Sequence, residues 1–461
     1  MTRTPSPALS ALISDLPVVT REPVVPGGFL VGGMTAGIKA SGRPDLAMIK
    51  VVDGPAPVAG VFTRNSFAAA PVRLCRAHLK ATNPTGDGRS GWTHGVVSTS
   101  GSANAATGEA GERDQAAIAG WLAAALGPTV TPEQTLGYST GLIGTRLPLD
   151  KVSAGIAALA TRLGSDGPAL AGTAEAFRTT DSRAKMATTT VQIAGPDGVA
   201  RTVRVSGIAK GVGMIHPRMA TMLSVVMTDA AVAAPEVLAD ILSPVAARTW
   251  NQLSVDGDTS TNDSVLLIAS GAAGTVPAAP GNAAFDALRN GVEAVARDLA
   301  RQQAADGEGA TTLLTCQVSG ALDDAEARAI ARAVISSSLV KAAFHGRDPN
   351  WGRIAGAAGN ARMTDAAILV AAGIPAGEAE RRGGGGVTVD PARLQIAIAG
   401  HTVYDGPAGG PAAFDKAEVR ADLDTPEVLV RLDLGLGDGR GEAFGCDLTE
   451  QYVIENSEYS T

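Results

Sequence analysis

The sequence predicts an α+β fold built in layers, and three observations support this prediction. Helical and extended hydrophobic patterns alternate along the chain, the extended segments are joined by turns typical of antiparallel pairs, and 45% of the 461 residues are hydrophobic. Amphipathic helices and half-buried strands each have an apolar face to cover, and packing them in layers covers both. The length corresponds to roughly two to four domains of about 100 to 200 residues.

The first 25 residues are predicted to be a flexible extension. This stretch contains several prolines and shows no hydrophobic period, so it lacks the apolar pattern of a folded segment. Its first 20 residues have no apolar core of signal-peptide length. No run in the chain approaches the ~18 uncharged apolar residues that can span a membrane.

Four segments have apolar residues at the spacing of amphipathic helices. In the first, Ile118, Trp121 and Leu122 fall on one face. The second begins at Pro235, a residue type that suits the first position of a helix. The last opens with acidic residues, which suit the positive end of a helix. The predicted helices are Gly111 to Leu126, Pro235 to Thr249, Phe285 to Leu299 and Asp323 to Val340.

Segments rich in Val, Thr and Ile with a period of two are predicted strands. One of them begins at Thr221, which is therefore expected to open a strand. The predicted strands are residues 188–194, 202–208, 221–229, 311–318, 394–399, 401–404 and 428–434.

The chain is predicted to contain two domains after the extension. The main domain spans residues 26–316, and a smaller C-terminal domain spans residues 317–461. Residues 373–386 end in four consecutive glycines, a composition that predicts a mobile insertion.

The composition argues against several classes of partner. The chain has a formal net charge of −8, whereas a protein that binds duplex nucleic acid needs a basic face that displaces counterions. The three cysteines, Cys75, Cys316 and Cys446, have no C-x-x-C spacing, which fits reduced thiols in a cytoplasmic protein. We therefore expect a cytoplasmic protein that acts on small molecules, without a nucleic-acid or membrane partner.

One short motif suggests a serine nucleophile. Residues 137–141 read Gly-Tyr-Ser-Thr-Gly, the G-x-S-x-G pattern of a nucleophile on a sharp turn between a strand and a helix. The residues before it are polar, and Ile143 to Pro148 cannot continue as a helix. Ser139 is therefore only a runner-up, and a catalytic triad would need His345 or His401.

The motifs for bound cofactors are incomplete. Asp256-Gly-Asp258 begins like a calcium loop but lacks the later glycine and glutamate that the loop requires. Residues 435–441 place Arg440 where a dinucleotide fingerprint needs its third glycine. The histidines lie far apart and form no recognisable metal-ligand cluster. We expect neither a metal nor a nicotinamide cofactor.

Short segments with uncommon residue combinations follow one another closely along nearly the whole chain, from about Gly28 to Thr461. Asp348-Pro-Asn-Trp-Gly-Arg353 is one of them, and Lys210 to Leu223 is another. In sequence and in order these segments resemble the ornithine acetyltransferase family, and so many ordered matches are more specific than any single motif. The matching segments are residues 37–46, 61–65, 100–108, 139–144, 179–181, 210–223, 255–263, 306–310, 348–353, 445–449 and 456–461.

The resemblance implies that the chain cuts itself between Ala220 and Thr221. The products would be an α chain of residues 1–220 and a β chain of residues 221–461. Cleavage gives Thr221 a free α-amino group, whose reference pKa is about 7.7 to 8, and this amine can act as the base for the hydroxyl of the same residue.

The implied activity is that of a glutamate N-acetyltransferase of arginine biosynthesis. The enzyme would move an acetyl group from N2-acetylornithine to glutamate through an acetyl ester on Thr221, without a cofactor, although acetyl-CoA is a possible alternative donor. The resemblance also makes the fold prediction more specific: a helix-sheet-sheet-helix sandwich with a smaller C-terminal α/β domain. The αβ units are expected to form a dimer or a higher assembly, such as a heterotetramer of two α and two β chains.

The family's site residues map onto matching positions of this chain. Thr140 and Gly141 are expected to form an oxyanion hole, in which fixed donors meet the charge that develops on a tetrahedral intermediate. Lys210 is expected to pair with a substrate carboxylate, and Glu308 with an ammonium group. The remaining expected substrate contacts, beside the nucleophile Thr221 itself, are Thr179, Asn456 and Thr461.

Three alternatives remain open from the sequence. The first is a related N-acyltransferase of a secondary-metabolite pathway, because Ser102, Ala106, Ser182 and Ala184 depart from the usual family residues near the expected cleft. The second is a self-processing amidohydrolase or aminopeptidase, in which water resolves the acyl-threonine. The third is an uncleaved chain whose function depends on Ser139 or on a binding surface.

Overall fold

The computed structural model describes residues 16–216 and 222–457. The predicted cleavage junction, Ala220 and Thr221, and the predicted substrate contact Thr461 lie outside the described residues. The strand predicted over residues 221–229 corresponds to β9, which begins at Leu223 and ends at Thr228, because the described residue Met222 is not part of it.

A six-stranded sheet forms one inner layer of the main body. Its order is β4-β3-β11-β9-β8-β7, and every pair is antiparallel except β9 and β11. The long β7–β8 hairpin arises from the Val- and Thr-rich segments predicted as strands. The strands are β3 (Ala56–Phe62), β4 (Ser90–Thr93), β7 (Lys185–Ala194), β8 (Ala200–Lys210), β9 (Leu223–Thr228) and β11 (Ser264–Ala269).

A four-stranded sheet forms the second inner layer. Its order is β1-β2-β5-β6, with β5 and β6 parallel and the other pairs antiparallel. The Tyr138 hydroxyl of this sheet donates a hydrogen bond of 2.9 Å to the Ser224 carbonyl of the other sheet, so the two sheets face each other. The strands are β1 (Phe29–Met34), β2 (Leu46–Val51), β5 (Gly95–Ser102) and β6 (Thr135–Leu142).

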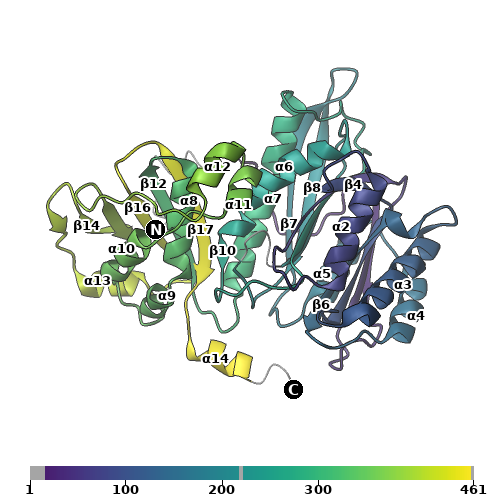
Figure 1. Ribbon diagram of the computed structural model, residues 1–461, viewed down its shortest axis with the longest axis horizontal. Helices are drawn as coiled ribbons and strands as arrows, with labels where there is room; N and C mark the ends of the chain where they lie inside the picture. Colours follow the sequence, from purple (N-terminus) through teal and green to yellow (C-terminus); the bar gives the residue numbers. More distant parts are fainter. Residues whose placement is uncertain (1–15, 217–221, 458–461) are drawn as a thin grey trace.

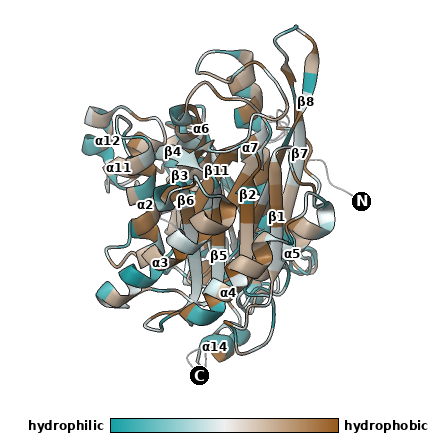
Figure 2. Ribbon diagram, turned by 90° about the vertical axis from the view of Figure 1, so that its right-hand side faces the viewer, coloured by the Kyte–Doolittle hydropathy of each residue, from teal (hydrophilic) through white to brown (hydrophobic). Residues whose placement is uncertain are grey.

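Helices cover the outer faces of both sheets, which confirms the predicted helix-sheet-sheet-helix order. One hydrophobic core joins α3 and α4 to the four-stranded sheet, and another joins α6 and α7 to the six-stranded sheet. A third core lies between the sheets and includes residues of α2 and α5, and Figure 2 shows the largely hydrophobic strands in the middle of this body. The helices are α2 (Ala70–Thr82), α3 (Gly108–Leu126), α4 (Leu149–Ala160), α5 (Gly167–Phe177), α6 (Pro235–Arg248) and α7 (Ala283–Ala305).

A seven-stranded sheet forms the C-terminal body, drawn on the left of Figure 1. Its order is β10-β17-β12-β16-β13-β14-β15, and α8 packs on β12 and β17. The strands are β10 (Leu253–Ser254), β12 (Leu313–Ala321), β13 (Gln395–Ile398), β14 (His401–Asp405), β15 (Gly410–Pro411), β16 (Glu427–Asp433) and β17 (Gly439–Cys446). The helices are α8 (Asp324–Ser336), α9 (Ser338–His345), α10 (Trp351–Gly359), α11 (Ala366–Ala371), α12 (Ala376–Arg382), α13 (Lys416–Asp422) and α14 (Glu450–Ser457).

Helix α7 lies between the two bodies (Figure 1) and contacts both. Its apolar face packs on the six-stranded sheet, while Arg297 and Arg301 place their guanidinium groups 5.5 and 5.6 Å from the centre of the Phe444 ring in β17. Arg297 also pairs with Glu442 of β17. Residue 316, where the sequence places the domain boundary, lies within β12, a strand of the C-terminal sheet.

Three segments differ from the sequence-based expectation. Residues 18–22 are not a free extension, because Thr20 pairs with Thr188 on the edge strand β7. The helix predicted from Asp323 to Val340 is two helices, because the Ser337 side chain caps the start of α9. Residues 373–386, predicted to be a mobile insertion, contain helix α12, and Arg382 of this helix pairs with Asp323. Among the described residues, no helix is long and apolar enough to cross a membrane.

Candidate active site

A cavity of about 340 Å³ brings together every predicted site residue that the structure describes. These residues come from segments far apart in the sequence and on both sides of the predicted junction. These residues lie close together in space because the ends of β6 and β8 and the loop after α7 border the same cavity. The predicted residues that line it are Thr140, Gly141, Thr179, Lys210, Glu308 and Asn456.

Thr140 and Gly141 lie near the end of β6. The φ of Gly141 is +129°, a value that side-chain-bearing residues rarely adopt. A Cβ at this position would also lie 2.4 Å from the backbone carbonyl carbon of Gly101 in β5. Glycine is therefore required for the close approach of the two parallel strands at the edge of the cavity.

Ser139 does not form a nucleophile elbow, so the serine alternative is wrong. The residue lies inside β6 rather than on a turn between a strand and a helix. Its side chain is buried and accepts a 3.0 Å hydrogen bond from the Thr99 hydroxyl. A serine fixed in this way cannot present its oxygen to a substrate.

Lys210 ends strand β8 and points toward Thr140. Its Nζ donates a hydrogen bond of 3.0 Å to Thr140 Oγ1. Burial lowers the pKa of the Lys210 ammonium, and the negative charge of Asp181 partly offsets this effect. In the β8–β9 pair Lys210 lies opposite Leu223, so this lysine is next to the strand that follows the predicted junction.

Glu308 lies in the loop after α7 and is held from two directions. Thr180 Oγ1 donates a 2.7 Å hydrogen bond to Glu308 Oε1, and Asn456 Nδ2 of α14 donates one of 3.0 Å to Oε2. A Cβ at Gly213 would lie 2.1 Å from Oε2, so the glycine leaves room for the carboxylate. The structure thus places an oriented anion in the cavity wall.

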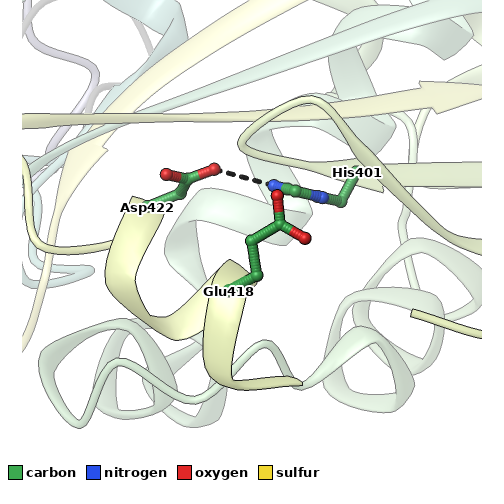
Figure 3. Close-up of side chains that lie close together, drawn as sticks. All are labelled: His401, Glu418 and Asp422. Atoms are coloured by element: carbon green, nitrogen blue, oxygen red, sulfur yellow. Dashed lines mark hydrogen bonds and ion pairs between the residues drawn. The ribbon is translucent and has the colours of Figure 1, made fainter. Parts of the chain in front are cut away.

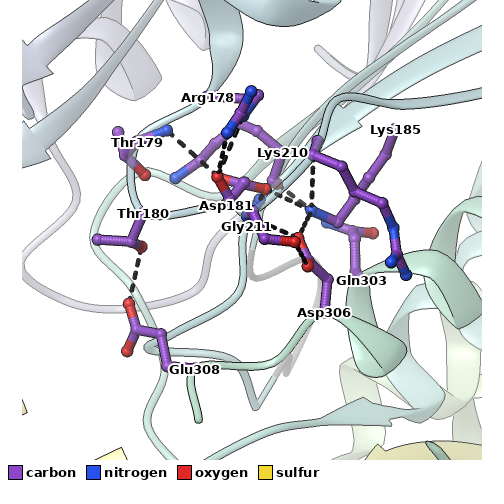
Figure 4. Close-up of polar contacts among 12 residues, drawn as sticks. Arg178, Thr179, Thr180, Asp181, Lys185, Lys210, Gly211, Gln303, Asp306 and Glu308 are labelled. Atoms are coloured by element: carbon purple, nitrogen blue, oxygen red, sulfur yellow. Dashed lines mark hydrogen bonds and ion pairs between the residues drawn. The ribbon is translucent and has the colours of Figure 1, made fainter. Parts of the chain in front are cut away.

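A buried network below the cavity fixes its loops (Figure 4). Lys185 Nζ lies 2.7 Å from Asp181 Oδ1 and 2.6 Å from Asp306 Oδ2, and all three side chains are buried. Asp181 Oδ1 also accepts a 2.8 Å hydrogen bond from the Gly211 N–H. Burial alone would raise the pKa of the Asp181 carboxyl, but the charges of Lys185 and Lys210 outweigh it and lower that pKa to about 2.

Lys39 hydrogen-bonds to the backbone of the loop that contains Thr179. Its Nζ donates hydrogen bonds to the carbonyls of Pro44, at 2.7 Å, and Arg178, at 2.5 Å. Arg178 directly precedes Thr179 in the sequence. Burial lowers the pKa of Lys39 to about 8, although the nearby Asp45 carboxylate opposes this shift. Lys39 therefore holds the backbone beside a predicted substrate contact.

Several residues at the cavity are not among the predicted site residues. Thr180, Met214 and Asn262 line it, and each lies in or next to a segment that matches the ornithine acetyltransferase family. Asn262 Nδ2 donates to the carbonyls of Ala103, at 2.6 Å, and Ser139, at 2.8 Å. Thr180, Met214 and Asn262 could have been suggested as site residues because they lie in or next to family-matching segments. Their contacts, however, are made between segments far apart in the sequence and depend on the tertiary structure.

One group of side chains has the composition of a metal site (Figure 3). His401 of β14 faces Glu418 and Asp422 of α13, with candidate ligand atoms within 4.8 Å of one another. His401 Nε2 and Asp422 Oδ2 are 2.8 Å apart, and the Asp422 side chain is 41% exposed. A histidine–carboxylate contact at the surface accounts for this geometry, and none of the three residues lines the cavity.

Comparison with known proteins gives a consistent family match. Residues 30–461 match the model of the ArgJ family. The chain is 44% identical over 437 residues to the arginine biosynthesis bifunctional protein ArgJ of Thermosynechococcus vestitus, covering 94% of this chain and 96% of that protein. It is 42% identical over 438 residues to the protein of the same name from Thermus thermophilus, covering 95% and 99%.

Two solved structures are also similar. The arginine biosynthesis bifunctional protein argJ of Bacillus halodurans is 36% identical, with a TM-score of 0.44, over 51% of this chain and 99% of the solved chain. The ornithine acetyltransferase of Mycobacterium tuberculosis, solved in complex with ornithine, is 37% identical, with a TM-score of 0.38, over 44% of this chain and 99% of the solved chain.

Proposed function

The chain belongs to the ArgJ family, and from this premise we propose that it transfers an acetyl group from N2-acetylornithine to glutamate by way of Thr221. The names of its relatives give arginine biosynthesis, and that of one solved relative gives ornithine acetyl transfer. The observation that carries the assignment to a site is the convergence of Thr140, Lys210 and Glu308 on one cavity.

The nucleophile is the hydroxyl of Thr221 after cleavage of the bond to Ala220. Thr221 lies two residues before Leu223, the partner of Lys210 in the β8–β9 pair. The free amine of Thr221 has a reference pKa of about 7.7 to 8 and serves as the base for the hydroxyl.

The reaction proceeds in two balanced steps. The Thr221 hydroxyl attacks the acetyl carbonyl of N2-acetylornithine, and its proton passes to the Thr221 amine. The tetrahedral intermediate then expels the α-amine of ornithine, which takes up that proton, and leaves an acetyl ester on Thr221. In the second step the amine of glutamate attacks the carbonyl carbon of the ester. One proton of that amine passes to the threonine oxygen as the ester bond breaks, which restores the Thr221 hydroxyl and releases N-acetylglutamate. An ester intermediate divides one difficult transfer into two easier steps.

Thr140 and Gly141 stabilise the oxyanion in both steps. Because the Lys210 ammonium donates its hydrogen bond to Thr140 Oγ1, the oxygen acts as the acceptor there and the hydroxyl hydrogen remains available to a second partner. A hydroxyl and a backbone N–H, here those of Thr140 and Gly141, are typical oxyanion-hole donors.

Glu308 recognises the side-chain ammonium of ornithine. Its carboxylate is oriented by Thr180 and Asn456 before any substrate arrives, so less ordering is needed on binding. The Lys210 ammonium is the matching group for a substrate carboxylate. Thr179, Asn456 and Thr461 complete the substrate contacts in this proposal.

The transfer requires no metal or bound cofactor in this proposal, and acetyl-CoA is the possible second acetyl donor. Two αβ units form the heterotetramer expected from the family. Measurement of the native mass tests the assembly, and replacement of acetylornithine by acetyl-CoA in the assay tests the second donor.

Intact-mass measurement tests the central proposal. The wild-type protein should give two polypeptides that begin at residues 1 and 221, and a brief exposure to acetylornithine should make the β chain heavier by one acetyl group. An isotope label in that acetyl group should appear in N-acetylglutamate. Thr221→Ala should abolish cleavage and transfer, whereas an active wild-type enzyme that stays uncleaved would contradict the proposal.

A further inference from the structure

A second cavity, of about 910 Å³, lies in the C-terminal body and reaches His216. It shares no lining residue with the catalytic cavity. Residues 213–216 contact both cavities, because Gly213 and Met214 line the catalytic cavity and His216 lines the second one. Three arginines line the second cavity, Arg332, Arg353 and Arg362, and we call it the arginine cavity.

The lining of the arginine cavity is positively charged, although the whole chain carries a net charge of −8. Arg332 on α8 is only 8% exposed. Among the described residues that line the cavity, Asp365 is the one acidic side chain, and it is already paired with Arg64. Arg332 has an interaction of its own, and Arg353 and Arg362 add two further guanidinium groups to a wall with one carboxylate.

The arginine cavity is also shaped by fixed groups. Arg353 Nη1 donates a 2.8 Å hydrogen bond to the Leu339 carbonyl, and the Arg353 N–H donates one of 3.2 Å to Asn350 Oδ1. Arg353 belongs to the first turn of α10, where the helix dipole favours an anion. A Cβ at Gly356 or Gly384 would meet no atom within 4 Å, so the wall is open at both glycines.

These features select a class of ligand. Guanidinium groups bind phosphate and carboxylate oxygens through pairs of hydrogen bonds, and the volume falls in the range of small-molecule pockets, about 300 to 1,000 Å³. Leu339, Met363 and Ile368 add an apolar part to the wall. We propose that the arginine cavity binds a phosphate-bearing small molecule of nucleotide size, with its phosphates at the arginines and its less polar part against these three side chains.

Calorimetric titration of the purified protein tests this proposal, with ADP and inorganic pyrophosphate as phosphate probes and succinate as a carboxylate probe. ADP should bind saturably with one molecule per chain, pyrophosphate more weakly, and succinate not measurably. Binding is measured without acetyl transfer, so the result does not depend on the proposed function.

Two pairs of variants locate the binding. Arg362→Gln should weaken ADP binding about tenfold or more, because a charge-assisted contact contributes about 1.5 to 3 kcal/mol, whereas Arg381→Gln on α12, outside the lining, should not. Gly356→Leu should block the cavity, and Gly359→Leu on the same helix should leave binding unchanged. Absence of saturable ADP binding, tighter binding of succinate than of ADP, or equal weakening by both arginine variants would overturn the proposal.

Discussion

Lys185 and Asp306 form a buried ion pair in which Lys185 Nζ lies 2.6 Å from Asp306 Oδ2, with side-chain exposures of 0% and 5%. The predicted cleavage junction lies between them in the sequence. After cleavage the pair would therefore join the α chain to the β chain. Because Lys185 also pairs with Asp181, it links the Thr179 loop to the loop that leads to Glu308.

Lys185→Met should strongly destabilise the protein. The substitution leaves the carboxylates of Asp181 and Asp306 buried beside each other without their cation, and breaking a buried pair in this way costs about 3 to 5 kcal/mol. Urea denaturation measures the change in the free energy of unfolding. Arg201→Gln is the matched control, because it breaks the exposed Arg201–Asp197 pair of the β7–β8 hairpin and should leave stability nearly unchanged. Equal stability of wild type and Lys185→Met would contradict this role.

Local patterns in the sequence predicted much of the fold. Pro235 does begin α6, and the apolar spacing after Phe285 does belong to one long helix, α7. Local patterns failed where a distant contact decides the structure. Residues 18–22 belong to the predicted flexible extension, and their β-branched run, Val18 to Thr20, is too short to predict a strand, yet they are ordered by hydrogen bonds to β7. Ser337 ends one helix and caps the next, which hydrophobic spacing alone does not reveal.

The candidate site was predictable only as a set of residues. Matching segments named Thr140, Lys210 and Glu308 correctly as neighbours of one cavity, but they gave no geometry. The Lys185–Asp306 pair escaped prediction because its partners are separated by 121 positions and meet only after the β7–β8 hairpin packs on α7. A buried ion pair depends on tertiary structure, so the residues around Lys185 in the sequence do not indicate that this lysine is paired.

Acid should weaken the protein through Asp181. Its pKa in the folded protein is about 2, below the usual value of 3.8. A lowered carboxyl pKa contributes stability that is fully present above the unfolded pKa and is lost as the pH falls through the folded one. The free energy of unfolding should therefore fall between about pH 4 and pH 2. The stability gap between wild type and Lys185→Met should narrow over the same range, and a gap independent of pH would contradict the assignment.

Gly141→Ala should disrupt the oxyanion hole. The substitution combines a positive φ with a contact of 2.4 Å to the Gly101 backbone, so β5 and β6 must separate at the cavity. Loss of one oxyanion donor costs about 10²- to 10³-fold in kcat, and steady-state acetyl transfer measures it. Gly144→Ala is the control, because Gly144 also has a positive φ, +84°, but a Cβ there meets nothing within 4 Å. Similar kcat values for the two variants would argue against close packing at Gly141.

Thr140→Ala should lower kcat while Thr140→Ser preserves most of it. Alanine removes the hydroxyl that accepts from Lys210 Nζ, whereas serine keeps an oxygen able to accept from the lysine and donate to an oxyanion. The expected loss for alanine is about 10²- to 10³-fold. Parallel assays of both variants, with cleavage checked by intact mass, separate a catalytic defect from failure to process. Equal activities of the alanine and serine variants would show that the hydroxyl is not needed.

Glu308→Gln should raise the KM for acetylornithine more than it lowers kcat. Glutamine keeps the size of the side chain and an oxygen that can accept from Thr180, but it removes the negative charge that faces the substrate ammonium. A charge-assisted hydrogen bond contributes about 1.5 to 3 kcal/mol, which corresponds to roughly a 10- to 150-fold rise in KM. Glu455→Gln on α14 is the control, because the exposed Glu455 carboxylate accepts a 3.0 Å hydrogen bond from Gln451 of the same helix and does not line the cavity. A fall in kcat without a change in KM would place Glu308 in the chemical step instead of in recognition of the ammonium group.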